Sequence, residues 1–400
     1  MNLLPNPACG RVQNGAQNAR HRPALRACGR RDRRVRGTCS RTPWPYGAAS
    51  GWLRAAAAGA AFLSVGAWLQ TARPAHAALT PHERAVDRGL AWLEQAQQPD
   101  GSWGSGPFRG SAAVTAQVVM AMIAAGSTPA SGPHAVSVAR GVEHLVGCAR
   151  ADGLIAGDEQ AAHGPMYAHA FATTALAEAY GEADDDRLAD VLVAARGLIE
   201  RTQNDQGGWR YQPQRRDADL SVTAAMVVAL RALHDGGFEV SADTVSRAAD
   251  FLTALQNDDG GFRYLPEAGP SGAPRTAAAL IALLLAGRAD ATVGQRGFSW
   301  LDDHPITLDA ADGYALYGLA HETAARWRWQ GLRTERTAAW TSWHAAIADR
   351  LVDAQRNDGS WSDPSCPEYG TAAAISILAM PRGLVPLFQP EPSGEKEEQR

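Results

Sequence analysis

A seven-residue phrase, Gln–x–x–x–Gly–x–Trp/Phe, occurs four times in this 400-residue chain, each time at the same point of a helical pattern. Self-similarity of this kind indicates a fold built from stacked copies of one supersecondary unit. The repeated residues are Gln97, Gly101 and Trp103; Gln203, Gly207 and Trp209; Gln256, Gly260 and Phe262; and Gln355, Gly359 and Trp361. Because they recur with the unit, we interpret them as structural residues rather than catalytic ones.

A helix is expected on each side of every phrase. Before the first phrase, Val86, Leu90 and Leu93 fall on one helix face. The glycine of the phrase then breaks the helix, because glycine tolerates the positive φ of a tight turn. The expected hinges are Asp100-Gly101, Asp152-Gly153, Gly207-Gly208, Asp259-Gly260 and Asp358-Gly359. With two degenerate copies, the pattern predicts an all-α fold of six helical hairpins over residues 82–386.

The phrase resembles the QW motif of the prenyltransferase and squalene oxidase repeat family, which includes squalene–hopene cyclases and the β-subunits of protein prenyltransferases. The resemblance covers about three quarters of the chain. It implies an (α/α)6 toroid, in which six outer helices surround six inner helices and a central cavity. In such a fold, polar residues at the hinge ends of the inner helices are the candidates for chemistry.

The cyclases of this family protonate an alkene, which needs a carboxylic acid that is kept protonated and made unusually acidic by its neighbours. The family carries that acid in an Asp-x-Asp-Asp-Thr-Ala motif, and the matching stretch here is Asp219-Leu-Ser-Val-Thr-Ala224. Ser221 and Val222 therefore stand where the resemblance places the paired acids. Asp217 and Asp219 remain as candidate catalytic acids. The alternative is that Asp219 or Ser221 only caps the helix.

The prenyltransferases hold a catalytic zinc ion with Asp, Cys and His. The resemblance aligns their Asp-x-Cys with Asp312-Gly-Tyr314, so tyrosine replaces the thiolate ligand. The expected histidine is replaced around Tyr369. One ligand of three does not make a zinc site. We therefore expect no metal and no cofactor, and we keep Asp312 and Tyr314 as catalytic candidates only if the protein is an enzyme.

Residues that could contact a ligand also lie near the expected inner helices. The ligand-binding candidates are Tyr167, His169, Arg275, Tyr314 and Tyr369. For His169 the alternative is a histidine that is hydrogen-bonded within the structure, because a histidine pair without further ligands rarely binds zinc.

Four tryptophans lie close together in residues 325–344. They suggest a partner or glycan surface, because Trp is enriched at such contacts. The alternative is packing of an outer helix with Trp340 and Trp343 on one face.

The termini differ in composition from the repeats. Residues 1–50 are rich in Arg and Pro and are expected to be disordered, or to be an over-extended gene start. Residues 51–77 have a basic residue, an apolar run and a small-x-small site, which is typical of a cleaved signal peptide. Export to the periplasm or exterior follows, with an uncleaved membrane anchor as the alternative. Residues 387–400 are expected to form a disordered, charged tail.

The charge is unevenly distributed. Residues 1–77 contain 12 of the 38 basic residues and one of the 42 acidic residues, so the remainder is strongly acidic. This balance disfavours nucleic acid or an anionic membrane surface as a partner, and no membrane contact is indicated beyond the signal segment. Cys148 and Cys366 fall in the second and sixth repeats, and their pairing is not favoured.

The scaffold residues persist while the family's catalytic groups are replaced. We therefore expect an exported, non-catalytic toroid that binds a small apolar ligand or a protein partner. One alternative is a cyclase or prenyltransferase-type enzyme with a divergent active site, and another is a toroid that binds or cleaves polysaccharide. The cavity lining discriminates between these hypotheses: convergent aromatic rings with one buried acid favour terpenoid chemistry, and a centre filled with small apolar side chains favours a structural role.

Overall fold

The computed structural model describes residues 79–157, 164–183, 185–289, 291–309, 313–331 and 337–389. These residues form twelve α-helices, three short 3-10 helices and no β-strand. The leader and signal segments predicted for residues 1–77 lie outside the described residues, as does Asp312.

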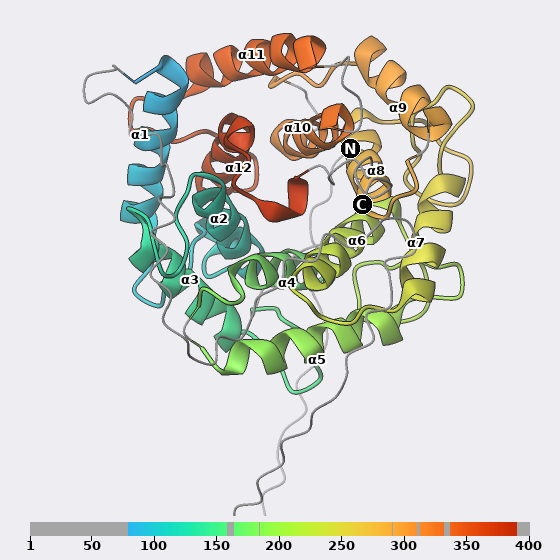
Figure 1. Cartoon of the computed structure of the whole chain (residues 1–400), viewed down its shortest axis with the longest axis horizontal. Helices are drawn as coiled ribbons and strands as arrows, with labels where there is room; N and C mark the ends of the chain where they lie inside the picture. Colours follow the sequence, from blue (N-terminus) through green and yellow to red (C-terminus); the bar gives the residue numbers. More distant parts are fainter. Residues whose placement is uncertain are drawn as a thin grey trace, which may run out of the picture. The chain divides into compact units, whose positions relative to one another are not determined.

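The helices alternate along the chain between an outer and an inner position (Figure 1). The outer helices are α1 (Pro81–Ala96), α3 (Ala135–Gly147), α5 (Arg187–Thr202), α7 (Ala242–Ala254), α9 (Ala291–Asp303) and α11 (Thr337–Ala354). The inner helices are α2 (Ala112–Ala124), α4 (Met166–Ala179), α6 (Leu220–Asp235), α8 (Ala273–Leu285), α10 (Ala315–Gly331) and α12 (Pro367–Ala379).

The inner helices form a closed ring within the helical domain. Each one packs against the inner helices before and after it, and α12 packs against α2. The outer helices also close into a ring, because the first of them, α1, contacts the last, α11. Helix α1 contacts the inner helix α12 as well. The all-α toroid predicted from the sequence is confirmed.

The two kinds of helix differ in their apolar surface. Outer helices such as α1 bury one stripe, which comprises Ala85, Val86, Gly89, Leu90 and Leu93. Inner helices such as α8 bury nearly every residue, because they lie between the outer helices and two inner neighbours. Their high alanine content suits this position, since small side chains allow close approach of neighbouring helices.

The glutamine of each repeated phrase joins two parts of the scaffold. Gln97 Nε2 donates to Gly101 O within its own hinge, at 3.0 Å, and to Ser137 O in α3, at 2.9 Å. Gln203 and Gln256 repeat both bonds, to α7 and to α9 respectively. The phrase glutamine therefore ties each hinge to the next outer helix.

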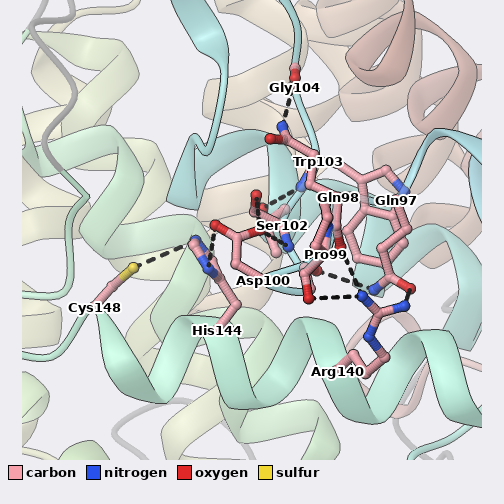
Figure 2. A network of polar contacts seen from close by, with 12 residues as sticks. Gln97, Gln98, Pro99, Asp100, Ser102, Trp103, Gly104, Arg140, His144 and Cys148 are labelled. Atoms are coloured by element: carbon pink, nitrogen blue, oxygen red, sulfur yellow. Dashed lines mark hydrogen bonds and ion pairs between the residues drawn. The ribbon is translucent and has the colours of Figure 1, made fainter.

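The aromatic residue of the phrase lies against its own hinge, as Trp103 does beside Gln97 and Gln98 (Figure 2). Trp103 is fully buried, and its indole Nε1 donates to Leu93 O at 2.7 Å. Its backbone N–H donates to Thr115 Oγ1 in the following inner helix, at 3.0 Å. The equivalent acceptors in the other complete repeats are Thr223, Thr276 and Thr371.

Glycine is required at the hinge for two reasons. Gly101 has a φ of +88°, and a Cβ there would lie 2.3 Å from Arg140 O. The Arg140 guanidinium in turn donates to Gln98 O at 2.7 Å and to Pro99 O at 3.0 Å (Figure 2). The next outer helix therefore approaches the hinge too closely for any other residue type.

The chain turns back into the domain after α12. Two 3-10 helices, Met380–Arg382 and Pro386–Phe388, follow it. Leu387 is fully buried, so residues 387–389, assigned to the charged tail from the sequence, belong to the fold. Leu387 and Phe388 are apolar, and the charged residues begin only after them. Residues 390–400 lie outside the described part of the chain.

Candidate functional site

An apolar cavity of about 110 Å³ lies among the inner helices, towards their C-terminal ends. Its walls are formed by side chains that include Met120, Phe171, Val228, Ile281, Ala320 and His321. The segment after α12 supplies the remaining wall through Leu384, Val385 and Phe388. The chain's own C-terminal segment therefore helps to enclose the cavity.

Tyr167 and Tyr317 lie one helical turn from this cavity, and together with Tyr211 and Tyr264 they form a group that we call the tyrosine layer. The Tyr167 ring lies 5.9 Å from the Phe171 ring, and the Tyr317 ring lies 4.2 Å from the His321 imidazole. Phe171 and His321 both line the cavity. Tyrosine therefore replaces the apolar lining at the hinge ends of α4 and α10.

The other two tyrosines come from the hinge loops rather than from helices. The Tyr211 ring lies 6.3 Å from the Tyr167 ring, and the Tyr211 and Tyr264 hydroxyls are 2.5 Å apart. The Tyr264 carbonyl accepts the Leu220 backbone N–H at 3.0 Å, which anchors its loop to the start of α6. Two hinge loops thus bring their hydroxyls together beside the first turn of α6.

Asp219 caps α6 and is fully buried. Its Oδ1 accepts the Val222 backbone N–H at 2.9 Å, and its Oδ2 lies 3.5 Å from Arg210 Nε. Burial raises the pKa of Asp219 to about 6, against the opposing effects of the Val222 N–H, the Tyr264 hydroxyl and the Arg210 charge. The carboxyl group therefore changes its charge within the neutral-to-acidic range.

The hydroxyls of Tyr167, Tyr264 and Tyr317 stay protonated at neutral pH. Burial raises the pKa of Tyr264, and the neighbouring Asp219 charge raises it further. Burial also raises the pKa values of Tyr167 and Tyr317, whereas a hydrogen bond of each with Ser221 lowers them. Ser221 therefore lies between two phenol groups at the position where the family resemblance places an acid.

The second acidic candidate, Asp217, lies outside this group. Its side chain is 65% exposed and pairs with Arg210 at 2.8 Å. The hydrogen bond from Arg210 lowers the pKa of Asp217. Arg210 thus bridges an exposed carboxylate and the buried Asp219, and only Asp219 belongs to the candidate site.

The structure assigns His169 to the scaffold. His169 is fully buried, and its Nδ1 accepts the Ile155 backbone N–H at 3.1 Å. In the degenerate second repeat, Ile155 takes the place of the phrase tryptophan, and His169 takes the place of the threonine that accepts from it. Burial lowers the pKa of His169 to about 4, so the ring is neutral. His169 is therefore hydrogen-bonded within the structure, which is the alternative that the sequence offered to a ligand-binding residue.

The remaining candidates have separate positions. Arg275 donates to Phe262 O at 3.1 Å and to Pro270 O at 2.9 Å, so it holds a hinge loop. Tyr314 is 55% exposed just before α10. Burial raises the pKa of Tyr369, with smaller contributions from Asp363 and Tyr317. Of these, Tyr369 lies at the edge of the tyrosine layer.

Two residues of the tyrosine layer were not identified from the sequence, although a signal was present. Tyr211 and Tyr264 each follow a phrase aromatic by two positions, in Trp209-Arg-Tyr and Phe262-Arg-Tyr. Only the third and fourth repeats carry this extension. A difference between otherwise equivalent repeats therefore marks the site better than the repeated phrase itself.

The four tryptophans of residues 325–344 lie on α10 and α11, which pack against each other. Trp329 and Trp340 are buried, and the Trp327 ring meets the Trp340 ring edge-on at 5.4 Å. The Arg326 guanidinium lies 4.9 Å above the Trp343 ring. These contacts account for the segment as helix packing.

The part of the chain that the structure describes has no cluster of three or more His, Cys, Asp or Glu side chains placed to hold a metal ion. Within the same residues, no helix combines the length and hydropathy needed to cross a membrane.

The site combines a buried carboxyl group with a neighbouring apolar cavity. A buried carboxyl group beside several hydroxyl donors is suited to hold a polar group of a ligand. The apolar cavity, which α6 also lines, can accept an apolar group of the same ligand.

Solved structures with a similar fold include a terpene cyclase and a mannosidase. The type II terpene cyclase MstE from Scytonema, in a variant solved with its product merosterolic acid A, is 19% identical with a TM-score of 0.52, and the match covers 76% of this chain and 98% of that one. A glycoside hydrolase family 76 mannosidase from Bacteroides thetaiotaomicron is 11% identical with a TM-score of 0.55 and the same coverage. At these identities the likeness concerns the fold alone.

No curated protein sequence matches the chain. The family model of the prenyltransferase alpha-alpha toroid domain matches residues 75–208 and 194–293, which together make up more than half of the chain. The chain therefore belongs to the prenyltransferase alpha-alpha toroid family.

Proposed function

We propose that this protein binds a small amphipathic molecule at the centre of the toroid without transforming it. The observation that carries this proposal is that the buried Asp219 carboxyl group and the hydrogen-bonded Tyr211 and Tyr264 hydroxyls lie beside the first turn of α6, whose Ala225 and Val228 line an apolar cavity. A ligand hydroxyl or amine would contact the carboxyl and phenol groups. An apolar group would occupy the cavity.

The size of the cavity restricts the ligand. An engineered apolar protein cavity of about 150 Å³ binds benzene, so the cavity here holds a group of roughly that size or smaller. A longer isoprenoid chain requires the wall formed by Leu384, Val385 and Phe388 to move. A short alcohol of the terpenoid class is therefore the first ligand to test.

The test measures binding of the five-carbon isoprenoid alcohol prenol (3-methylbut-2-en-1-ol) to the purified protein by isothermal titration calorimetry. Ala320→Phe fills the cavity and is expected to weaken binding by tenfold or more, whereas Val136→Phe, at a position 74% exposed, is expected to leave affinity unchanged. Asp219→Asn is expected to weaken an amine analogue more than the alcohol. Equal affinity of the wild type and Ala320→Phe would place the ligand elsewhere.

A divergent enzyme is the second candidate, and the raised pKa of Asp219 favours it. A carboxyl group that titrates at about 6 can exchange protons near neutral pH, as a general acid or base must. The test is incubation with geranylgeranyl substrates and analysis of the products by gas chromatography. Turnover that Asp219→Asn abolishes would replace the binding proposal with this one.

We also propose that the protein is exported, because residues 51–77 have the pattern of a cleaved signal peptide. The expected mature N-terminus lies near Ala78. N-terminal sequencing of protein purified from the native host checks this, and recovery of residues 1–50 from a cytosolic fraction would contradict it.

A further inference from the structure

Three side chains at the first hinge have the order of a thiol, an imidazole and a carboxylate (Figure 2). His144 and Cys148 are four residues apart on α3, so they share a helix face. Cys148 Sγ lies 3.6 Å from His144 Nε2, within hydrogen-bonding distance for sulfur. His144 Nδ1 lies 3.8 Å from Asp100 Oδ2, which is an ion-pair distance. The imidazole therefore separates the thiol from the carboxylate.

The hinge fixes the carboxylate of this group. Asp100 Oδ1 accepts both the Ser102 backbone N–H, at 3.0 Å, and the Ser102 hydroxyl, at 2.7 Å. Its Oδ2 atom, which accepts neither of these bonds, faces the His144 imidazole. The His144 side chain is 14% exposed and the Asp100 side chain 59% exposed, while Cys148 is partly exposed. A small reagent can therefore reach the sulfur.

Cys148 lies at the C-terminal end of α3, where the helix itself disfavours a thiolate. The C-terminal end of a helix carries partial negative charge, which stabilises a cation in the last turn and opposes an anion there. His144 lies in the last turn of α3, and Cys148 is its C-cap. A thiolate at Cys148 would therefore need a cation beside it, and the His144 imidazole is the group placed to supply one, with the Asp100 carboxylate on the far side of the ring.

We propose that Cys148 is a nucleophilic thiol that His144 deprotonates and Asp100 supports through His144, and that it is a site of modification by peroxides. The thiolate sulfur attacks one oxygen of the peroxide, the S–O bond forms and the O–O bond breaks. The leaving hydroxide takes the proton from His144 Nε2 and departs as water. Sulfur is oxidised by two electrons to the sulfenic acid, and the peroxide is reduced by two.

The other cysteine of the described region is an internal control. Cys366 is buried, and burial raises the pKa of its thiol to about 12. Cys366 is therefore expected to react slowly under every condition in which Cys148 is tested.

The experiment measures the alkylation rate of each cysteine in the full-length protein by iodoacetamide, read by peptide mass spectrometry between pH 5.5 and 9. An ordinary thiol with a pKa of about 8.5 is only about 1% thiolate at pH 6.5. Cys148 is expected to react at that pH roughly tenfold faster than such a thiol. Hydrogen peroxide followed by dimedone is expected to label Cys148 and not Cys366.

Two variants separate activation from simple exposure. His144→Asn is expected to move the inflection of the Cys148 rate profile to pH 8.5 or above, and Asp100→Asn to move it part of the way. Glu143→Gln, an exposed neighbour on α3 that pairs with Arg187, is the matched control and should change nothing. Circular dichroism checks that each variant is folded. A wild-type inflection near pH 8.5, or a profile that His144→Asn leaves unchanged, would overturn the proposal.

Discussion

The Nδ1 atom of His169 accepts the backbone N–H of Ile155 at 3.1 Å, in the place where the complete repeats use a threonine hydroxyl. In the first repeat, for example, Thr115 accepts from Trp103 at 3.0 Å. The larger imidazole occurs together with the smaller Ile155, so the two substitutions compensate in volume. The second repeat is thus degenerate in sequence but keeps the hydrogen bond between hinge and inner helix.

This exchange predicts the effect of replacing His169. His169→Ala leaves the buried Ile155 N–H without its acceptor and opens a cavity, so it is expected to lower the free energy of unfolding by roughly 2–4 kcal/mol. His169→Thr, combined with Ile155→Trp to restore the usual pair, should recover a large part of that loss. Urea denaturation followed by circular dichroism measures both. An unchanged midpoint in His169→Ala would exclude the structural role.

The hinge tryptophan gives a second prediction. Trp103→Ala removes a fully buried ring and its bond to Leu93 O, with an expected cost of roughly 3–5 kcal/mol. Trp103→Phe should cost clearly less, because Phe262 occupies the same place in the fourth repeat. Thermal unfolding of the two variants decides. Similar losses in both would mean that the indole hydrogen bond, rather than ring burial, dominates.

The raised pKa of Asp219 predicts a pH dependence of stability. Between its usual value of 3.8 and about 6, the folded state binds more protons at Asp219 than the unfolded state. The contribution of protonated Asp219 to the free energy of unfolding is therefore fully present below pH 3.8 and is lost as the pH rises through 6. Asp219→Asn keeps a capping side chain but cannot ionise. The free energy of unfolding of the variant minus that of the wild type is therefore expected to be roughly 1–3 kcal/mol larger at pH 7.5 than at pH 4.5. Calorimetry at both pH values checks the sign, and an equal effect at each would contradict it.

The segment after α12 is expected to behave as part of the fold. Arg328 is buried and donates to Leu387 O at 3.2 Å and to Gln389 O at 2.5 Å. A chain that ends at Gly383 should therefore be less stable by several kcal/mol, because a buried charge loses acceptors. It should also bind an apolar fluorophore more strongly, because one cavity wall is gone. Deletion of residues 390–400 is the control and should alter neither property.

The fold could be predicted because its signals are local and repeated. The glycine at Gly101 and the tryptophan at Trp103 obey short-range rules of turn geometry and burial, and the same rules operate in each copy. Likewise, α6 starts at Leu220, directly after Asp219, which the sequence offered as a helix cap.

The site was less predictable because it depends on distant pairs. The hydroxyls of Tyr211 and Tyr264 meet although 53 positions separate them, and no periodic pattern in the sequence records that approach. Asp219 was named as a candidate, but its burial arises from neighbours on other repeats. His169 was included as a possible ligand-binding residue because its role as a replaced threonine is visible only when Ile155 is seen beside it.

The hydrogen bond from Gln355 Nε2 to Ala85 O, at 2.8 Å, joins the last hinge to the first helix. Open repeat proteins need atypical end units to protect exposed apolar faces, and their stability is a sum over neighbours. Here the first and last hairpins protect each other, and a contact between residues 270 positions apart completes the circle. Partial unfolding from one end consequently exposes two interfaces instead of one. A circular permutant that opens the chain at another hinge and joins the present ends should therefore keep the same circle of contacts, with only the order of assembly changed.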